Sequence, residues 1–161
     1  MNTRKTILEI KGILILILAL YFILVIIGNL TDYGTNFAFV EHVMRMDTTF
    51  NSENMMWRSI DSNIFHHLFY WIIILTEILA AIYLGIGGSK ILNKNKLIQS
   101  KGRKISLKGL FVSMILWFGY FITIGGEWFL MWQSETWNGI GSAFRMFTIS
   151  AILFIALLHK D

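Results

Sequence analysis

Apolar residues gather in four long blocks along this chain of 161 residues, at about 12–30, 64–88, 109–132 and 139–158. An α-helix needs roughly 20 apolar residues to cross a bilayer, and each block is about that long. The chain has no proline that would break a block, so four largely continuous helices are the simplest expectation. We therefore predict an all-α membrane protein, in which residues 1–161 form a single membrane domain folded as a four-helix bundle.

The connection between the first two blocks, residues 31–63, is the only sizeable segment outside the predicted spans. Between residues 36 and 46 the apolar positions recur at helical spacing, while the charged positions face elsewhere. That pattern is typical of an amphipathic helix that lies in the membrane interface. We predict that residues 31–63 form a cap on the extracytoplasmic side of the bundle, with an interfacial helix followed by a loop.

Basic residues orient the predicted bundle. Of the 14 lysines and arginines, 11 lie on one side, in the N-terminal segment, the connection 89–108 and at Lys160. Because positive residues resist translocation, we predict that both termini and the basic loop 89–108 are cytoplasmic. The net charge of +4 is explained by attraction to anionic lipid, and it requires no nucleic-acid partner.

Composition agrees with a membrane protein and excludes several kinds of site. Charged residues make up 15% of the chain, against about 25% in soluble domains. There is no cysteine, so a disulfide, a thiolate zinc site or a cysteine nucleophile cannot form. The basic start before the first block could belong to a signal peptide, but the block is long and lacks a cleavage pattern, which favours a retained anchor.

Three charged residues lie inside the predicted spans, namely Glu77, Glu127 and Arg145. Each is expected to face the bundle interior, because a charge exposed to hydrocarbon is costly. Glu127 and Arg145 lie within about two turns of the outer boundary and could meet. They are interpreted either as an ion pair that locks two helices or as a site for an anionic or protonatable ligand. Glu77 lies deeper, where it is expected to hydrogen bond to a neighbouring helix.

Polar and aromatic residues also follow helical stripes. His66, Tyr70 and Glu77 share one face of the second predicted helix, and Tyr120 shares a face of the third with Glu127. The outer half of the bundle is thus expected to contain a polar pocket that opens outward, although a filled, hydrogen-bonded core would give the same pattern. The ligand or polar-core candidates are His66, Tyr70, Glu77, Tyr120, Glu127 and Arg145.

The sequence requires no cofactor, and no metal site is predicted. His42, His66, Met44 and Met46 are ligand types that suit copper(I), but methionine also serves as ordinary packing. A haem held by two histidines needs them on facing helices, whereas only the second block contains membrane histidines. Haem would need Met131, His42 or a second subunit to supply the other ligand, and quinone is a further ligand that the expected pocket could hold.

Two further patterns are interpreted structurally. Ala81, Gly85 and Ser89 form a small-residue ridge that favours close helix packing. Residues 125–138 concentrate three tryptophans, as expected for an aromatic belt at a membrane boundary. The same tryptophans could instead wall a ligand site or a partner interface.

The run NLTDYGTNFAFVEHVMRMDTTF (29–50), together with MWR (56–58) and the later GGEWFLMWQS, resembles the bacterial family described as predicted small integral membrane proteins. The resemblance covers nearly the whole chain. It implies a bacterial plasma (inner) membrane protein with four spans, and it carries no catalytic residue across because the function of the family is unknown. It directs attention to the cap, where the match is closest, at Asp32, Tyr33, Asn36, His42, Asp47, Trp57 and Arg58.

Three functions remain open. The leading hypothesis is a non-catalytic accessory or partner-binding subunit of a larger membrane complex, because the chain is small and has no sizeable soluble domain. The alternative is a protein that binds a small ligand or cofactor, whether quinone, haem or metal, in the outward-facing polar pocket. A proton-coupled transporter or channel is the second alternative, although the inner half offers no polar path. No nucleophile or reaction identifies an enzyme, and no catalytic residue is predicted.

Overall fold

The computed structural model describes residues 3–159, and Lys160 lies outside them. The α-helices are α1 (Thr3–Thr31), α2 (Tyr33–Arg45), α3 (Asn63–Ile91), α4 (Lys96–Met114) and α5 (Ile140–Leu158). A π-helix, η2 (Ile115–Trp128), continues α4. Two short 3-10 turns lie in the connections, η1 (Met56–Arg58) between α2 and α3 and η3 (Met131–Gln133) between η2 and α5. Four helices in the described part of the chain are long and apolar enough to cross a membrane. The predicted all-helical, four-span class is therefore confirmed.

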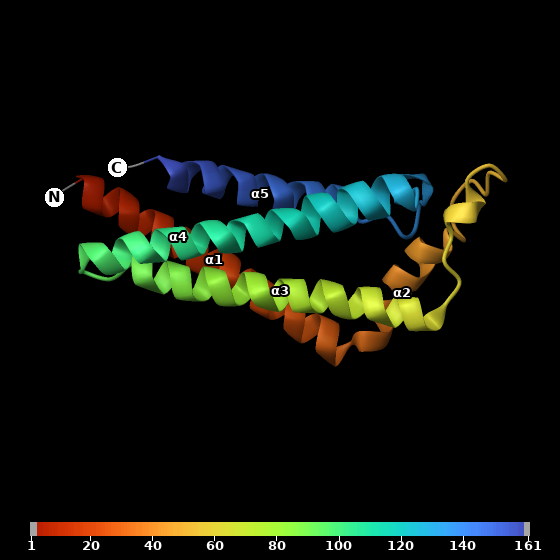
Figure 1. The fold of residues 1–161 in the computed structure, drawn as a ribbon, viewed down its shortest axis with the longest axis horizontal. Helices are drawn as coiled ribbons and strands as arrows, with labels where there is room; N and C mark the ends of the chain where they lie inside the picture. The colour runs from red at the N-terminus through yellow and green to blue at the C-terminus, as the bar shows by residue number, and fades with distance from the viewer. Residues whose placement is uncertain (1–2, 160–161) are drawn as a thin grey trace.

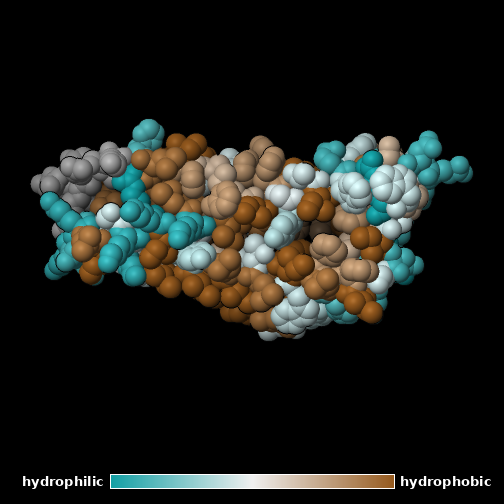
Figure 2. Space-filling model, in the orientation of Figure 1, coloured by the Kyte–Doolittle hydropathy of each residue, from teal (hydrophilic) through white to brown (hydrophobic). Residues whose placement is uncertain are grey.

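The long helices lie along the long axis of the molecule (Figure 1). At one end, here called the basic end, α1 begins, α5 ends and α3 turns into α4. At the other, the cap end, α2 and the following connection run across the bundle. Figure 2 shows a mostly apolar middle between two hydrophilic ends, as a membrane-spanning molecule requires.

The helices α3 and α4 form a tight hairpin at the basic end. An added Cβ at Gly87 would lie 2.6 Å from the Ser106 backbone nitrogen, and one at Gly102 would lie 2.7 Å from the Ile91 nitrogen. Only glycine permits this approach of the two backbones. The small-residue ridge predicted at Ala81, Gly85 and Ser89 does not make this contact. An added Cβ at Gly85 would have no neighbour within 4 Å, and Ser89 is exposed.

The expected loop over 89–108 is largely helical. The α3 helix continues to Ile91 and α4 begins at Lys96, which leaves a turn of only residues 92–95. Asn95 caps α4, because its Oδ1 accepts hydrogen bonds from the backbone nitrogens of Leu97 (2.9 Å) and Ile98 (3.3 Å). The basic residues of this segment therefore extend two helices beyond the apolar blocks instead of forming a loop.

The α5 helix is fastened to α4 at two levels. In the interior, the Ser113 and Ser150 hydroxyls form a hydrogen bond of 2.7 Å. At the basic end, the Arg103 guanidinium donates to the backbone carbonyls of Leu157 and His159. Carbonyls at the C-terminus of a helix lack intrahelical partners, and a cation satisfies both their hydrogen bonding and the helix dipole.

The π-helix changes which side chains of the third span face inward. Backbone and side-chain hydrogen bonds here step over five residues, as from Phe129 N to the Ile124 carbonyl at 3.0 Å and from Thr123 Oγ1 to the Phe118 carbonyl at 2.8 Å. The buried residue near the start of η2 is accordingly Trp117, and the buried residues near its end are Gly125 and Gly126. The helix ends at Trp128, earlier than the predicted residue 132. Just beyond this end, Leu130 adopts a left-handed conformation with φ of 54°.

The α2 helix confirms the expected amphipathic helix between the first two spans, although it begins at Tyr33 instead of Asn36. Its buried residues Val40 and Met44 pack with Met46 against α3 and the residues that follow η2. The apolar face that was expected to rest on lipid thus packs against the bundle. The remainder of the cap follows as a loop with the single turn η1.

Candidate functional site

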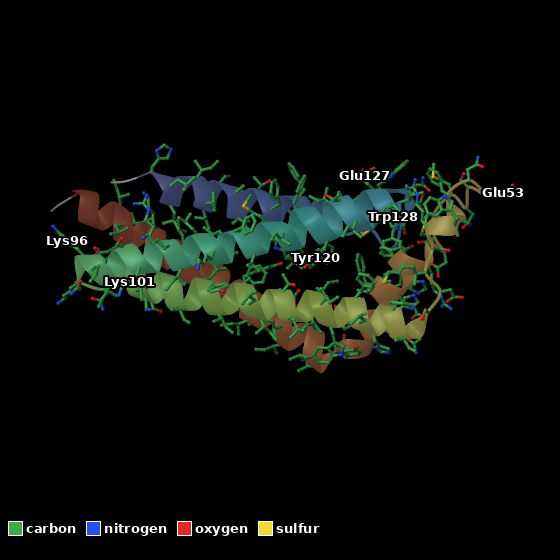
Figure 3. The ribbon with its side chains drawn as sticks, in the orientation of Figure 1. Glu53, Lys96, Lys101, Tyr120, Glu127 and Trp128 are labelled. Atoms are coloured by element: carbon green, nitrogen blue, oxygen red, sulfur yellow. The ribbon has the colours of Figure 1, made fainter. Side chains whose placement is uncertain are left out.

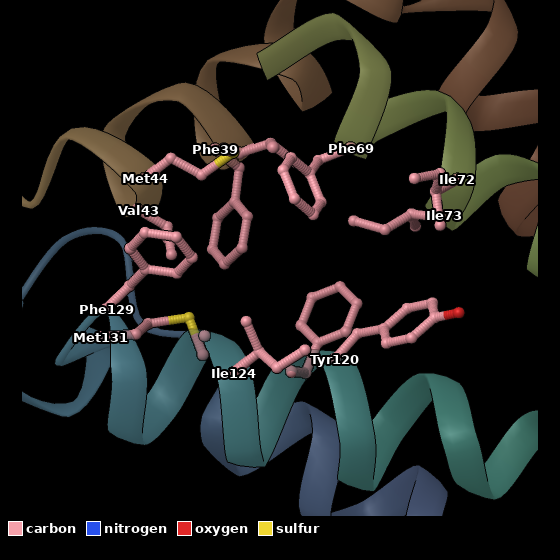
Figure 4. A pocket seen from close by; sticks show the side chains of 13 residues that line it. Phe39, Val43, Met44, Phe69, Ile72, Ile73, Tyr120, Ile124, Phe129 and Met131 are labelled. Carbon is pink, nitrogen blue, oxygen red and sulfur yellow. The ribbon is translucent and has the colours of Figure 1, made fainter. Parts of the chain in front are cut away.

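An apolar pocket of about 280 Å³ lies between α2, α3 and η2. Figure 4 shows side chains from all three elements, and from the segment after η2, pointing into a common space. The pocket is lined by Phe39, Val40, Val43, Met44, Phe69, Ile72, Ile73, Tyr120, Phe121, Ile124, Gly125, Phe129 and Met131. We call this space the cap pocket.

The pocket exists because α3 and the α4–η2 helix diverge from their hairpin toward the cap end (Figure 1). The α2 helix closes the cap end of the space, and Gly125, which has no side chain, is part of its η2 wall. Two lining side chains, Phe69 and Ile124, are also exposed on the molecular surface, and the surface is hollowed between η2 and α3 in Figure 2. The pocket therefore opens sideways, toward the surface that faces lipid.

The chemistry of the cap pocket is almost entirely hydrocarbon. Tyr120 supplies the one polar side-chain group among the lining residues, and its hydroxyl points toward the deep end, away from α2 (Figure 4). Met44 and Met131 contribute flexible thioethers that adapt to ligand shape. This cavity differs from the expected polar pocket, because only Tyr120 of the six polar candidates lines it.

His66, Tyr70 and Glu77 do share a buried face of α3, but each has a protein partner of its own. His66 Nε2 bonds to the Ile60 carbonyl (2.7 Å) and the Tyr70 hydroxyl donates to the Asn29 carbonyl (3.1 Å). Glu77 is 2% exposed and accepts a hydrogen bond of 2.8 Å from Asn29 Nδ2 on α1. Tyr70 and Glu77 thus join α3 to α1, whereas His66 joins α3 to the connection that precedes it.

Glu127 and Arg145 do not face the interior as expected, because both are exposed. Among residues 3–159 no ion pair joins them, and the Arg145 guanidinium donates to Ser142 Oγ on its own helix (2.9 Å). The π-helical register turns Glu127 outward. Figure 3 shows Glu127 and Trp128 at the cap end, next to the connection that carries Glu53.

One group of cap residues packs on the start of α3. The Tyr33 hydroxyl and His67 Nδ1 form a hydrogen bond of 2.8 Å, and the Phe37 ring stacks on His67 with centroids 4.1 Å apart. Burial raises the pKa of the Tyr33 hydroxyl. Asn36 Nδ2 donates to the Asp32 carbonyl (3.0 Å), while the Asp32 side chain is exposed.

A second group of cap residues contacts the end of η2. The Arg58 guanidinium lies 5.5 Å from the Trp57 ring and 5.3 Å from the Trp128 ring, and Arg58 Nη1 reaches the Glu127 carbonyl at 3.5 Å. The cation–π contact with Trp128 ties the loop to the third span, while the one with Trp57 lies within the loop.

A third group joins α2 to the segment before α5. His42 Nδ1 pairs with Asp47 Oδ2 at 2.8 Å, and its ring stacks on Trp137 with centroids 4.6 Å apart. The cap candidates from the sequence thus form three separate sets of contacts that attach the cap to the bundle. They are not gathered into one site.

The candidate metal and haem ligands are also dispersed. Within residues 3–159 no three histidine or acidic side chains are grouped so that they could hold a metal ion. Met44 and Met46 are buried in the apolar cluster under the cap. The Met131 sulfur accepts a hydrogen bond from the Gly139 nitrogen (3.4 Å).

Comparison with protein families gives one match, and it spans the bundle and the cap together. A family model described as predicted small integral membrane protein, DUF2165, matches residues 7–160. The chain belongs to this family. The assignment agrees with the resemblance seen in the segments 29–50, 56–58 and 125–134, and it makes this DUF2165 member a multi-pass integral membrane protein. No curated protein and no solved structure matches the chain, so its function must be argued from its own site.

Proposed function

We propose that this DUF2165 member binds the hydrocarbon part of a small lipophilic molecule in the cap pocket. The observation that carries the proposal is a space of about 280 Å³ whose lining has one hydroxyl and is otherwise apolar. An apolar cavity of about 150 Å³ suffices to bind benzene, so this pocket has room for a longer alkyl or isoprenoid segment. The sideways opening gives such a chain a route from the bilayer.

Burial from water does not drive this binding, because the surrounding lipid is as apolar as the pocket. Selectivity must then come from shape and from a polar contact. The rings of Phe39, Phe69 and Phe129 supply rigid walls. Tyr120 supplies the contact, since its hydroxyl has no side-chain or backbone partner in the described part of the chain and can bond to a carbonyl or hydroxyl of the ligand. A quinone or an acyl lipid carries such a group.

The test is a lipid analysis of protein purified from its native membrane in nanodiscs, with the extract compared with bulk membrane lipid by mass spectrometry. The pocket-filling variant is Ile124→Trp, and the matched control is Ile82→Trp, which adds the same ring at an exposed position of α3 outside the pocket. We expect one lipophilic species to be enriched in the wild type and the control, and to fall several-fold in Ile124→Trp.

Two results would count against the cap pocket as a ligand site. Extracted lipid identical to bulk membrane lipid would remove the ligand, and equal retention by Ile124→Trp and the control would place it elsewhere. The chemical class of an enriched species separates an isoprenoid quinone from an acyl lipid. A Tyr120→Phe variant then tests the polar contact, because it removes only the hydroxyl.

A second candidate function, an accessory subunit of a larger membrane complex, is favoured by an aromatic rim at the cap end. Phe50 and Trp57 are 71% and 68% exposed, and Trp128 and Trp132 are also exposed beside them. Exposed clusters of large aromatic side chains are characteristic of interface hot spots. Mass spectrometry of copurifying proteins tests this candidate, with Trp57→Ala and Trp132→Ala expected to release a stoichiometric partner if one binds the rim.

The orientation we propose places the basic end in the cytoplasm of a bacterium and the cap outside its plasma membrane. The support is the gathering of lysines at the basic end, where Figure 3 labels Lys96 and Lys101. The cap end contains acidic residues and only Arg45 and Arg58 among the basic ones of residues 31–63.

A further inference from the structure

A second apolar groove, independent of the cap pocket, lies between α1 and α5. It has a volume of about 340 Å³ and is lined by Leu14, Ile17, Leu18, Tyr21, Met146, Ile149, Ile152 and Leu153. The two helices run antiparallel (Figure 1). From the basic end to the cap end, the residue numbers of the lining therefore increase along α1 and decrease along α5. The groove therefore extends along the bundle axis for about two helical turns, or about 10 Å.

A cationic side chain, that of Arg145, lies at the cap end of this groove. Arg145 directly precedes the lining residue Met146 and lies four residues before Ile149 and seven before Ile152, so it shares the groove-facing side of α5 with them. The Arg145 side chain is exposed, and its hydrogen bond within the described chain is to the neutral Ser142. No described carboxylate pairs with it, so its charge is left uncompensated.

Such an arginine in a membrane span requires an anion or water. Arg145 lies five residues after the first residue of α5, or about 8 Å along the helix, which is within reach of the headgroup region for a long side chain. A guanidinium binds phosphate in a bidentate manner. The groove continues from that point toward the bilayer centre, which is the path of an acyl chain attached to a headgroup at Arg145.

We propose that the α1–α5 groove is a binding site for an anionic phospholipid, with its phosphate on Arg145 and one acyl chain along the groove. The lining residues include no acidic side chain, and the charge of Arg145, whose described hydrogen bond is to the neutral Ser142, stands at the cap end of the groove. Charge complementarity therefore selects a net-negative lipid. The site uses α1 and α5, whereas the cap pocket uses α2, α3 and η2, so the two sites can be occupied independently.

The experiment is native mass spectrometry of the full chain from nanodiscs that contain phosphatidylglycerol and phosphatidylcholine in equal amounts. The variants are Arg145→Gln and Ile149→Trp, which fills the groove while Arg145 remains. Lys101→Gln is the charge-matched control, because Lys101 is exposed at the basic end. We expect wild type and Lys101→Gln to retain one phosphatidylglycerol preferentially. Arg145→Gln should reduce that preference about tenfold, as the loss of a charge-assisted hydrogen bond implies, and Ile149→Trp should also reduce it.

Retained phosphatidylglycerol that is equal in wild type and Arg145→Gln overturns the proposal, and so does retention without preference for charge. If Arg145→Gln does not fold, Ile149→Trp and Arg145→Lys test the proposal in its place. The lysine variant keeps the charge but loses the bidentate fork, so it should retain less lipid than wild type. A lipid-free dimer that crosslinks through α1 and α5 would mean that a second copy covers the groove, and it also contradicts the proposal.

Discussion

Two buried polar side chains of α3, Tyr70 and Glu77, are bonded to the same residue of α1. Glu77 and Tyr70 both engage Asn29, one through the Asn29 side chain and the other through its carbonyl. A single asparagine near the end of α1 therefore anchors that helix to α3 at two points. Polar groups buried among apolar helices are stabilising only while they stay paired.

We expect Asn29→Leu to destabilise the protein by about 1 kcal/mol, the usual worth of an interhelical hydrogen bond in a membrane. The reason is that the Glu77 carboxyl then loses its donor while it remains buried. The double variant Asn29→Leu with Glu77→Leu removes both partners and should be more stable than Asn29→Leu alone. Unfolding free energies measured in detergent for the wild type, both single variants and the double variant check this, and strictly additive effects would contradict it.

Residue-level prediction from the sequence succeeded where the helix is regular. The α3 helix keeps α-helical spacing, so the stripe of His66, Tyr70 and Glu77 was correctly expected to face one way. It failed for Glu127, because a π-helix departs from that spacing. It also failed for Arg145, since a charge this near a helix end can reach the membrane boundary without turning inward.

At the scale of elements, the α3–α4 hairpin is the most closely packed unit of the bundle. Gly87 on α3 and Gly102 and Gly109 on α4 lie close against the opposite helix, and the small-residue ridge expected from the sequence lies elsewhere on α3. The sequence indicates that small residues favour close packing. It does not indicate which of several candidates meets the neighbouring helix, because that depends on the crossing geometry.

Two glycines on the same helix therefore give a matched test. Gly87→Ala should lower the melting temperature by several degrees, because its methyl group would lie 2.6 Å from the Ser106 backbone nitrogen and the two helices would have to separate. Gly85→Ala has nothing within 4 Å and should be neutral or slightly stabilising, since alanine favours helix. Thermal unfolding in one detergent compares the two variants, and equal melting temperatures would exclude the close contact.

The whole molecule has opposite chemistry at its two ends, and this was readable from the sequence. Block length indicated four spans and the basic residues identified one end. The amphipathic pattern indicated the cap helix. The cap pocket was not predictable, because its lining is ordinary apolar sequence and the space arises from the divergence of α3 from η2. Of the six ligand or polar-core candidates only Tyr120 lines it, and Met44 and Met131, considered as metal or haem ligands, line it as apolar side chains.

The absence of native cysteine permits a direct test of orientation. Glu53→Cys and Lys101→Cys place single thiols at exposed positions of the cap end and the basic end, and Figure 3 labels both sites. In intact bacterial cells whose outer layers are permeable to the reagent, a maleimide that does not cross the plasma membrane should label Glu53→Cys. It should label Lys101→Cys only after that membrane is disrupted. The reverse pattern would invert the proposed orientation.

The π-helix η2 has a consequence for how this chain can vary among its relatives. Each residue of an ordinary α-helix advances the chain by about 100° around its axis. A one-residue insertion or deletion between Ser113 and Phe129 would therefore rotate every later side chain of the third span onto another face. A deletion would bring Glu127 to the buried position that Gly126 now occupies, and either change would carry Trp128 away from Arg58. A relative that differs in length over this segment must thus present a different aromatic rim, and alignment gaps there mark a change of outer surface.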